Sequence, residues 1–212
     1  MIVIGLTGGI GMGKSTATNT FRRLRIPVFD ADAAVHRLQG KGGRAVAPIA
    51  AAFPGCVAEG RVDREALRRA VLGQPDAMKR LEDIVWPLVR DEERRFLARA
   101  RRAGRRIAVL DIPLLLETGG QDRVDLVLVV SAPASVQRAR VLRRPGMTAE
   151  RFAAIRGRQV PDAEKRRRAD AVVRTGLSRH FAQASLRRLI ARMDWREGNL
   201  PRPPALRCVF GN

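Results

Sequence analysis

Residues 8–15 read Gly8-Gly9-Ile10-Gly11-Met12-Gly13-Lys14-Ser15, which matches the pattern G-x-x-x-x-G-K-[S/T] at every position. The apolar segment 2–6 before this motif predicts a buried strand, and residues 16–25 after it carry apolar side chains at helical spacing. Strand, glycine loop and helix in that order is the context in which such a loop binds nucleotide phosphates. A glycine-rich turn that binds nothing is the alternative, and the complete motif in this context disfavours it.

Each part of the loop has a distinct task at a triphosphate. The glycines let successive N–H groups point into one concavity, and the helix N-terminus adds partial positive charge. Lys14 is able to reach the β- and γ-phosphates, and the Ser15 hydroxyl is able to ligate Mg²⁺. We therefore expect a nucleoside triphosphate site.

The composition indicates a cytoplasmic enzyme. A chain of 212 residues is long enough for one α/β core with a small inserted subdomain. No apolar run approaches the roughly 18 residues of a transmembrane helix, and the first residues lack the features of a signal peptide. Cys56 and Cys208 lie too far apart in the sequence to indicate a metal site or a disulfide framework.

The formal net charge is +20, and 37 of the 41 basic residues are arginine. Three interpretations stay open: solvated helix faces, a cleft for anionic small substrates, and nucleic-acid binding. Aromatic residues interleaved with the basic ones would favour nucleic acid, but only 4% of the chain is aromatic and it contains no tyrosine. We expect no nucleic-acid partner.

Acidic residues follow two of the predicted strands. The short strand 28–29 leads to Asp30 and Asp32, and the strand 107–111 ends at Asp111. Ligands of parallel sheets bind at the carboxyl ends of the strands, so at least one of the first two carboxylates is expected to face the phosphates. Asp30 suits the role of a helix N-cap, and Asp32 is the functional candidate. Asp111 has two equal interpretations, an acid near Mg²⁺ or a helix cap.

Residues 33–106 have a mainly helical pattern, broken by glycines at 40–43 and by residues 54–55. This stretch is longer than a single crossover and predicts a helical subdomain, in which Asp63 is a candidate N-cap. Within it, Trp86 is most simply a packing residue and His36 a surface residue. The near-continuous apolar run 124–130 then predicts a central parallel strand.

The stretch 138–168 is the most arginine-dense part of the chain. A turn at 145–148, with Thr148 as the expected N-cap, separates two helical segments and suggests a lid that carries arginines toward phosphate. Most of these arginines must be solvated, because a site uses only two or three. A last strand within 169–176 and a helix over 178–193 follow. The tail 194–212 is expected to be irregular and dispensable for chemistry.

Over residues 1–193 the chain resembles the dephospho-coenzyme A kinase family. The resemblance rests on sequence blocks in the family's order: 5–16, 30–32, 62–64, 112–117, 140–147, Gln159 and 169–173. The first block is more specific than a general phosphate loop. The Asp30-Ala31-Asp32 block and the Pro-Leu-Leu-x-Glu block at 113–117 add further specificity.

The resemblance implies ATP-dependent phosphorylation of the ribose 3′-hydroxyl of dephospho-CoA, which gives CoA and ADP in the last step of CoA synthesis. It implies an α/β P-loop three-layer sandwich with a parallel five-stranded sheet, a helical subdomain and a lid. The core would comprise 1–32, 107–137 and 169–193, the CoA-binding subdomain about 33–106, and the lid about 138–168. The partners would be ATP, Mg²⁺ and dephospho-CoA, for a monomer or small homo-oligomer.

The resemblance also implies residue roles. Lys14 would bind the transferring phosphoryl group, Asp32 would accept the 3′-hydroxyl proton, and Arg140 would stabilise the transition state. The loop residues that would cradle ATP, with Ser15 also on the metal, are Gly11, Met12, Gly13, Lys14, Ser15 and Thr16. The residues that would bind dephospho-CoA are Asp32, Arg64, Pro113, Leu114 and Glu117.

One departure from the family and two rival functions bear on this interpretation. Where the family usually has His-Pro-Leu, this chain has Trp86-Pro87-Leu88, so either Trp86 substitutes in packing or the affinity for the acceptor changes. A nucleoside monophosphate kinase would need a different acceptor subdomain. A nucleotide-regulated switch is the rival outside enzymes, but no guanine-reading Asn-Lys-x-Asp tetrad occurs in the chain.

Overall fold

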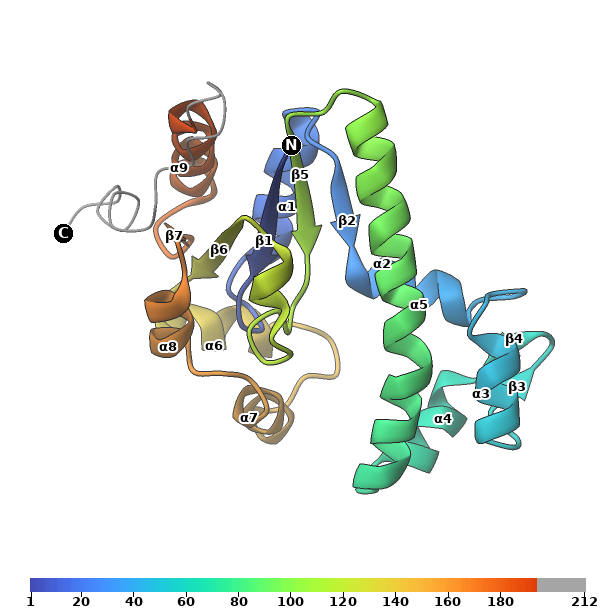
Figure 1. The fold of residues 1–212 in the computed structure, drawn as a ribbon. Helices are drawn as coiled ribbons and strands as arrows, with labels where there is room; N and C mark the ends of the chain where they lie inside the picture. The colour runs from blue at the N-terminus through green and yellow to red at the C-terminus, as the bar shows by residue number, and fades with distance from the viewer. Residues whose placement is uncertain (194–212) are drawn as a thin grey trace. The chain divides into compact units, whose positions relative to one another are not determined.

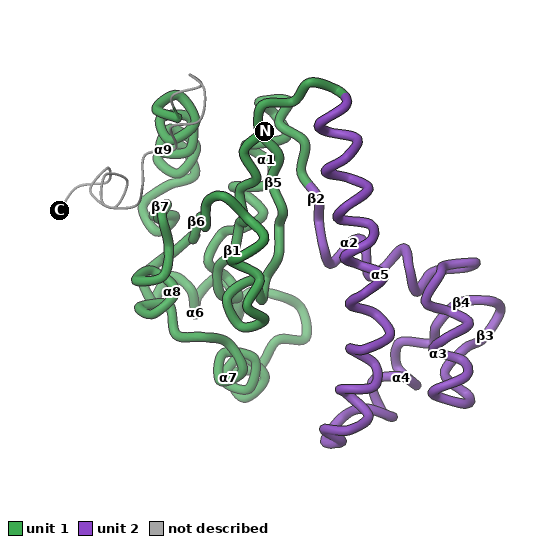
Figure 2. Tube along the Cα trace, in the orientation of Figure 1, with its two compact units in different colours: residues 1–28, 103–212 green, residues 29–102 purple. Residues whose placement is uncertain are grey.

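The computed structural model describes residues 1–193 and divides the chain into two compact units. The first unit contains residues 1–28 and the chain from 103 onward, and the second contains 29–102 (Figure 2). The second unit occupies nearly the same stretch as the helical subdomain expected at 33–106. The tail expected to be irregular, and Cys208 within it, lie outside the described residues.

A five-stranded sheet has the strand order β2-β5-β1-β6-β7 (Figure 1), and four of its strands, β5, β1, β6 and β7, belong wholly to the first unit. The pairs β1–β5, β1–β6 and β6–β7 are parallel, with Ile4 opposite both Val109 and Leu126. The strands are β1 Ile2–Thr7, β2 Val28–Asp30, β5 Ile107–Asp111, β6 Leu126–Ser131 and β7 Ala171–Arg174. The prediction of a parallel α/β sheet is confirmed.

The apolar run of β6 is buried on both faces of the sheet. Leu128 and Val130 pack with residues of α1 and α9, whereas Val127 and Val129 pack with Leu115 on the opposite face. Successive side chains of a strand point to opposite faces, so a strand covered on both sides needs apolar residues at every position. This requirement explains the unbroken run seen in the sequence.

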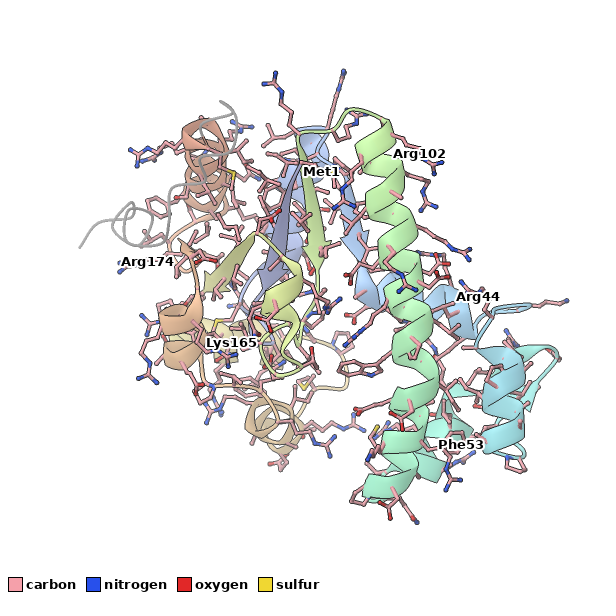
Figure 3. All side chains as sticks on the ribbon, in the orientation of Figure 1. Met1, Arg44, Phe53, Arg102, Lys165 and Arg174 are labelled. Atoms are coloured by element: carbon pink, nitrogen blue, oxygen red, sulfur yellow. The ribbon has the colours of Figure 1, made fainter. Side chains whose placement is uncertain are left out.

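Helices connect the strands of the first unit, and α1 packs against α9. The helical segments are α1 Lys14–Arg23, η1 Gly120–Arg123, α6 Ala134–Leu142, α7 Ala149–Gly157, α8 Asp162–Arg168 and α9 Arg179–Arg192. Nitrogen-tipped side chains project from α9 and from other helices into solvent (Figure 3). Many of the arginines are therefore solvated. None of the described helices is both long and apolar enough to cross a membrane.

The second unit has its own core, in which α2 and α5 pack together around Leu38, Ile49 and Val85. Its elements are α2 Ala31–Gln39, α3 Val46–Ala52, β3 Val57–Ala58, β4 Arg61–Val62, α4 Arg64–Val71 and α5 Pro75–Arg102. The small hairpin β3–β4 was not predicted. Its two-residue turn places Glu59 and Gly60 at positive φ, and glutamate is not a residue that signals such a turn.

The predicted helix starts are confirmed. The Asp30 carboxylate accepts from the Ala33 N–H at 2.9 Å, and Asp63 accepts from the N–H groups of Glu65 and Ala66. Thr148 caps α7 in the same way. Each cap satisfies N–H groups that the first turn of a helix leaves without a partner.

Replacing the fully buried Phe21 by alanine should destabilise the fold. Phe21 lies at the centre of the contact between α1 and the sheet, so Phe21→Ala should cost about 3–5 kcal/mol of unfolding free energy. Leu24→Ala, at the exposed end of the same helix, should cost on the order of 1 kcal/mol or less. Urea unfolding of both variants measures the difference, and equal losses would contradict this description of the core.

Candidate active site

At both glycine positions that the motif fixes, the loop between β1 and α1 leaves no room for a side chain. Gly13 has φ 88°, and a Cβ there would lie 3.0 Å from the Thr175 hydroxyl oxygen. A Cβ on Gly8 would lie 2.7 Å from the Val130 carbonyl oxygen. These contacts explain why the glycine pattern is required at the end of β1.

The loop directs several N–H groups into one concavity. Internal bonds use the N–H groups of Met12 and Thr16, which donate to the carbonyls of Gly9 and Gly13 at 3.1 Å. The N–H groups of residues 11, 13, 14 and 15 have no acceptor within the described part of the chain. Unpaired N–H groups at a helix N-terminus attract an anion, so the loop is suited to phosphate.

Lys14 is held at the end of β5. Its ammonium lies 2.5 Å from Asp111 Oδ1, and the Thr18 hydroxyl donates to Asp111 Oδ2 at 2.6 Å. Asp111 is buried, whereas Lys14 keeps part of its side chain exposed. The Asp111 carboxylate binds Lys14 and Thr18 of α1 and caps none of the described helices, so the helix-cap interpretation is wrong. The interpretation as an acid near Mg²⁺ stays a prediction.

Arg140, near the end of α6, is fixed to the residue that follows β7. Its guanidinium donates to the Thr175 hydroxyl at 3.2 Å and to the Thr175 carbonyl at 2.6 Å. The Thr175 hydroxyl in turn donates to the Met12 carbonyl at 2.6 Å. Arg140 is thus linked through one residue to the phosphate loop, and its charge is held in position before any ligand arrives.

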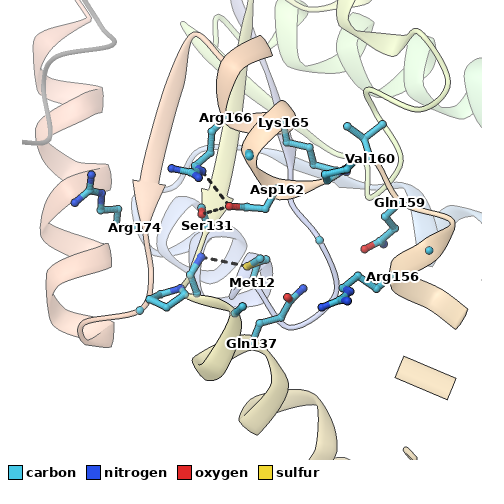
Figure 4. Close-up of a pocket in the computed structure, with 18 of the residues that line it drawn as sticks. Met12, Ser131, Gln137, Arg156, Gln159, Val160, Asp162, Lys165, Arg166 and Arg174 are labelled. Atoms are coloured by element: carbon cyan, nitrogen blue, oxygen red, sulfur yellow. Dashed lines mark hydrogen bonds and ion pairs between the residues drawn. The ribbon is translucent and has the colours of Figure 1, made fainter. Parts of the chain in front are cut away.

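A cavity of about 850 Å³ adjoins the loop within the first unit (Figure 4). Gly9 and Met12 line it on the loop side, and Ser131, at the end of β6, lies on its wall. Arg156, Arg166 and Arg174 add positive charge to the lining. The cavity lies at the carboxyl ends of the strands, where open α/β sheets bind their ligands.

The segment from Gln159 to Lys165 is bonded to the loop on one side and to Glu117 on the other. The Gln159 side chain accepts from the Ile10 N–H at 3.0 Å. Glu117 Oε1 accepts from the Val160 N–H at 3.0 Å and lies 2.7 Å from the Lys165 ammonium. The Lys165 side chain is fully buried and makes no well-aligned hydrogen bond, so charge attraction dominates this contact.

Asp32 and Arg64 belong to the second unit. Asp32 is exposed in the first turn of α2, directly after Asp30 and Ala31, and His36 lies one helical turn further on. The Arg64 guanidinium contacts His36 Nδ1 at the start of α4. The second unit therefore presents a carboxylate, an imidazole and a guanidinium group along α2 and α4.

The predicted residues divide between the two units. The first unit brings together the loop residues 11–16 and Arg140, as described above. Of the block at 113–117, the Pro113 carbonyl accepts from Thr7, Leu114 is exposed, and Glu117 holds Val160 and Lys165. Glu117, expected to bind the acceptor, thus has Val160 and Lys165 as its partners within the protein.

Sequence reasoning missed Thr175 and Gln137. The Gln137 side chain is buried and donates to the Ile10 carbonyl at 2.8 Å. Thr175 follows β7 directly, and the rule that ligands bind at strand carboxyl ends would have indicated it. Gln137 lies inside a helix with no motif around it, so no sequence signal marked it.

The residues near Lys14 fit a magnesium ion. Ser15 is exposed and offers a hydroxyl oxygen, the hard ligand that Mg²⁺ prefers. Within residues 1–193 no cluster of three or more metal-binding side chains occurs.

Comparison with known proteins gives a consistent result. The family model described as dephospho-CoA kinase matches residues 2–179. A protein of that name from Mesorhizobium japonicum is 55% identical over 199 residues, which cover 94% of this chain and all of the relative. Another from Paramagnetospirillum magneticum is 61% identical over 166 residues, 78% of each chain.

Solved structures share the fold. A crystal structure from Thermus thermophilus superposes with a TM-score of 0.78 at 36% identity, over 90% of this chain and 96% of that one. A dephospho-CoA kinase from Campylobacter jejuni gives a TM-score of 0.61 at 21% identity, over 89% and 95% of the two chains. At that identity the second likeness concerns the fold alone.

Removing the buried ammonium of Lys165 should leave Glu117 as an uncompensated buried charge. Lys165→Met should therefore cost about 3–5 kcal/mol of unfolding free energy. Adding Glu117→Gln should recover part of this loss, because the amide oxygen can still accept from Val160. Chemical denaturation of the two variants measures both effects.

Arg166→Met is the matched control for Lys165. Arg166 lies on the same helix and pairs with Asp162 at 3.0 Å, but about half of its side chain is exposed. An exposed pair contributes only about 0–1 kcal/mol. If Lys165→Met lowers the unfolding free energy no more than Arg166→Met does, the ion pair between Lys165 and Glu117 does not stabilise the fold as expected.

Proposed function

The chain belongs to the dephospho-CoA kinase family, and we propose that Lys14, Asp32 and Arg140 carry the chemistry of that family in it. The reaction transfers the γ-phosphoryl group of ATP to the ribose 3′-hydroxyl of dephospho-CoA and gives CoA and ADP, the last step of CoA synthesis. The observation that carries the proposal is the family match over residues 2–179 of a chain with a complete phosphate loop.

ATP binds with its phosphates on the loop of residues 11–16 and its nucleoside in the adjoining cavity. The unpaired loop N–H groups and the arginines of the cavity lining support this orientation. Mg²⁺ would be held by the Ser15 hydroxyl together with donor phosphates. When bound, the ion neutralises charge on the β- and γ-phosphate oxygens.

Lys14 stabilises the phosphoryl group as it moves from donor to acceptor. Its ammonium is oriented by Asp111 and lies next to the loop N–H groups. The negative charge of the transferring group spreads over its three equatorial oxygens, so a cation fixed in advance lowers the barrier. Arg140, held by Thr175, supplies a second fixed cation.

Asp32 acts as the general base. The acceptor 3′-oxygen forms a bond to the γ-phosphorus while the bond from that phosphorus to the β–γ bridging oxygen breaks. The hydroxyl proton passes to the Asp32 carboxylate, and ADP leaves with the electrons of the broken bond. Asp30, whose carboxylate caps α2, is occupied structurally, which supports Asp32 as the base of this pair.

The setting of the reaction is also part of the proposal. We place the enzyme in the cytoplasm, where ATP is available, with small-molecule partners only, as a monomer or small homo-oligomer. Arg64 and residues of the 113–117 block are proposed to serve the acceptor, with Glu117 acting through its contacts to Val160 and Lys165.

A coupled assay of ADP release tests the substrate directly. With ATP and Mg²⁺, dephospho-CoA should support turnover, whereas AMP and shikimate should give rates near background. EDTA should abolish the signal, and excess Mg²⁺ should restore it. Turnover with AMP but not with dephospho-CoA would refute the proposed acceptor.

The neighbouring aspartates provide a matched pair for the base. Asp32→Asn should lower kcat by a factor on the order of 10²–10⁴ with little change in the KM for ATP, because a general base is lost. Asp30→Asn should leave kcat nearly unchanged, since asparagine caps a helix as well as aspartate does. Steady-state kinetics of both variants decides the role, and near-native turnover of Asp32→Asn would assign Asp32 to structure.

A further inference from the structure

Two buried polar side chains contact carbonyl groups of the phosphate loop, and the mechanism above does not use these contacts. The Gln137 amide extends from α6 and donates to the Ile10 carbonyl at 2.8 Å (Figure 4). The Thr175 hydroxyl donates to the Met12 carbonyl at 2.6 Å. Gln137 and Thr175 have exposed fractions of only 5% and 4%, so little water competes for either carbonyl.

Each of these carbonyls shares its peptide unit with the N–H group of the next residue. The loop peptides are trans, and in a trans peptide the C=O and the N–H point in opposite directions. A side chain that holds the Ile10 carbonyl on one side of the loop therefore directs the Gly11 N–H to the other side. In the same way, the hydroxyl on the Met12 carbonyl directs the Gly13 N–H.

The two N–H groups directed in this way are among those that the loop leaves unpaired. Those of Gly11 and Gly13 have no acceptor within the described part of the chain. The Ile10 N–H donates to Gln159, and the Met12 N–H donates to a carbonyl of the loop itself. Along residues 10–13, N–H groups bonded within the protein thus alternate with N–H groups left for a ligand. Successive free N–H groups of this kind form a concavity that binds phosphate.

The helix that carries Gln137 also carries Arg140. A Cβ on Gly11 would lie 3.1 Å from the Gln137 carbonyl oxygen, so the loop lies directly against α6. Gln137 and Arg140 are three residues apart and therefore share one face of that helix. Gln137 contacts the loop itself, whereas Arg140 contacts it through Thr175. One helix thus holds both the loop and the second fixed cation.

We propose that Gln137 and Thr175 are positioning residues for phosphoryl transfer. By holding two loop carbonyls, they aim the N–H groups of Gly11 and Gly13 at the phosphates of the donor. Hydrogen-bond donors that are aimed before the reaction stabilise the developing charge without reorganisation. The inference rests on the proposed function, which places ATP on this loop, and it adds two residues that act through the loop backbone.

Binding of ADP and of adenosine tests Gln137. Gln137→Met keeps the length of the side chain but loses the donor to Ile10, so the Kd for ADP should rise about tenfold as hydrogen bonds to a charged group weaken. Adenosine has no phosphate and should bind with unchanged affinity. Displacement of a fluorescent ATP analogue measures both constants. The same substitution at the half-buried Gln183, on α9 and outside the cavity lining, should change neither.

The Thr175 hydroxyl can be removed and restored without losing the Arg140 contact, because the Thr175 carbonyl still accepts from Arg140. Thr175→Val loses the donor to Met12 and should raise the KM for ATP about tenfold, with the KM for dephospho-CoA within about twofold. Thr175→Ser keeps the hydroxyl and should restore most of the affinity for ATP. Equal KM values for ATP in the two variants would contradict the role of the hydroxyl.

NMR of protein labelled with ¹⁵N-glycine reports the two amides directly. Saturation with ADP should move the amide protons of Gly11 and Gly13 downfield, because each donates to phosphate. Gln137→Met should reduce the shift of Gly11 more than that of Gly13, and Thr175→Val should do the opposite.

The proposal is overturned if Gln137→Met binds ADP as the native protein does, if ADP and adenosine weaken equally, or if both variants reduce both glycine shifts alike. ADP binding needs no acceptor, so these results are separate from the identity of the acceptor. A protein that shows the expected glycine shifts but does not phosphorylate dephospho-CoA would contradict the proposed function and leave the two positioning residues in place.

Discussion

The ion pair between Lys14 and Asp111 joins the first residue of α1 to the end of β5. The phosphate loop connects β1 to α1 and therefore ends at this ion pair. Without a partner, the ammonium of Lys14 would extend into solvent. With Asp111 beside it, the charge stays at the loop, and Thr18 holds the second oxygen of the same carboxylate. A cation oriented before the substrate arrives needs little reorganisation during the reaction.

Hydrogen bonds from other elements also fix the phosphate loop in position. Thr175 joins the Met12 carbonyl to Arg140. The Gln159 side chain accepts from the Ile10 N–H, and the Gln137 side chain donates to the Ile10 carbonyl. Residues of α6, of the segment between α7 and α8, and of the end of β7 thus meet at the loop that follows β1. The second unit contributes a carboxylate, an imidazole and a guanidinium group along α2 and α4. We propose that the loop of the first unit holds the donor phosphates and that Asp32 of the second unit is the base.

The sequence predicted what local patterns encode. The apolar run of β6, the glycine motif and the caps at Asp30, Asp63 and Thr148 all have signals within a few residues, and the structure confirms them. The hairpin β3–β4 was not predicted because its turn has Glu59 at positive φ, where glutamate is atypical. The pair Glu117–Lys165 and the contact of Arg140 with Thr175 join residues that are far apart in sequence, so only the folded chain shows them. The roles of Lys14, Asp32 and Arg140 in the reaction, and those of the expected binding residues, stay predictions.

The identity of the product tests the central claim most directly. Incubation of the protein with ATP, Mg²⁺ and dephospho-CoA, followed by ³¹P NMR of the purified product, locates the new phosphate. The account predicts a single new phosphomonoester resonance that couples to the ribose 3′-proton, with an equal amount of ADP. A phosphate at the 2′-hydroxyl or on the pantetheine arm, or ADP formed without any phosphorylated acceptor, would contradict it.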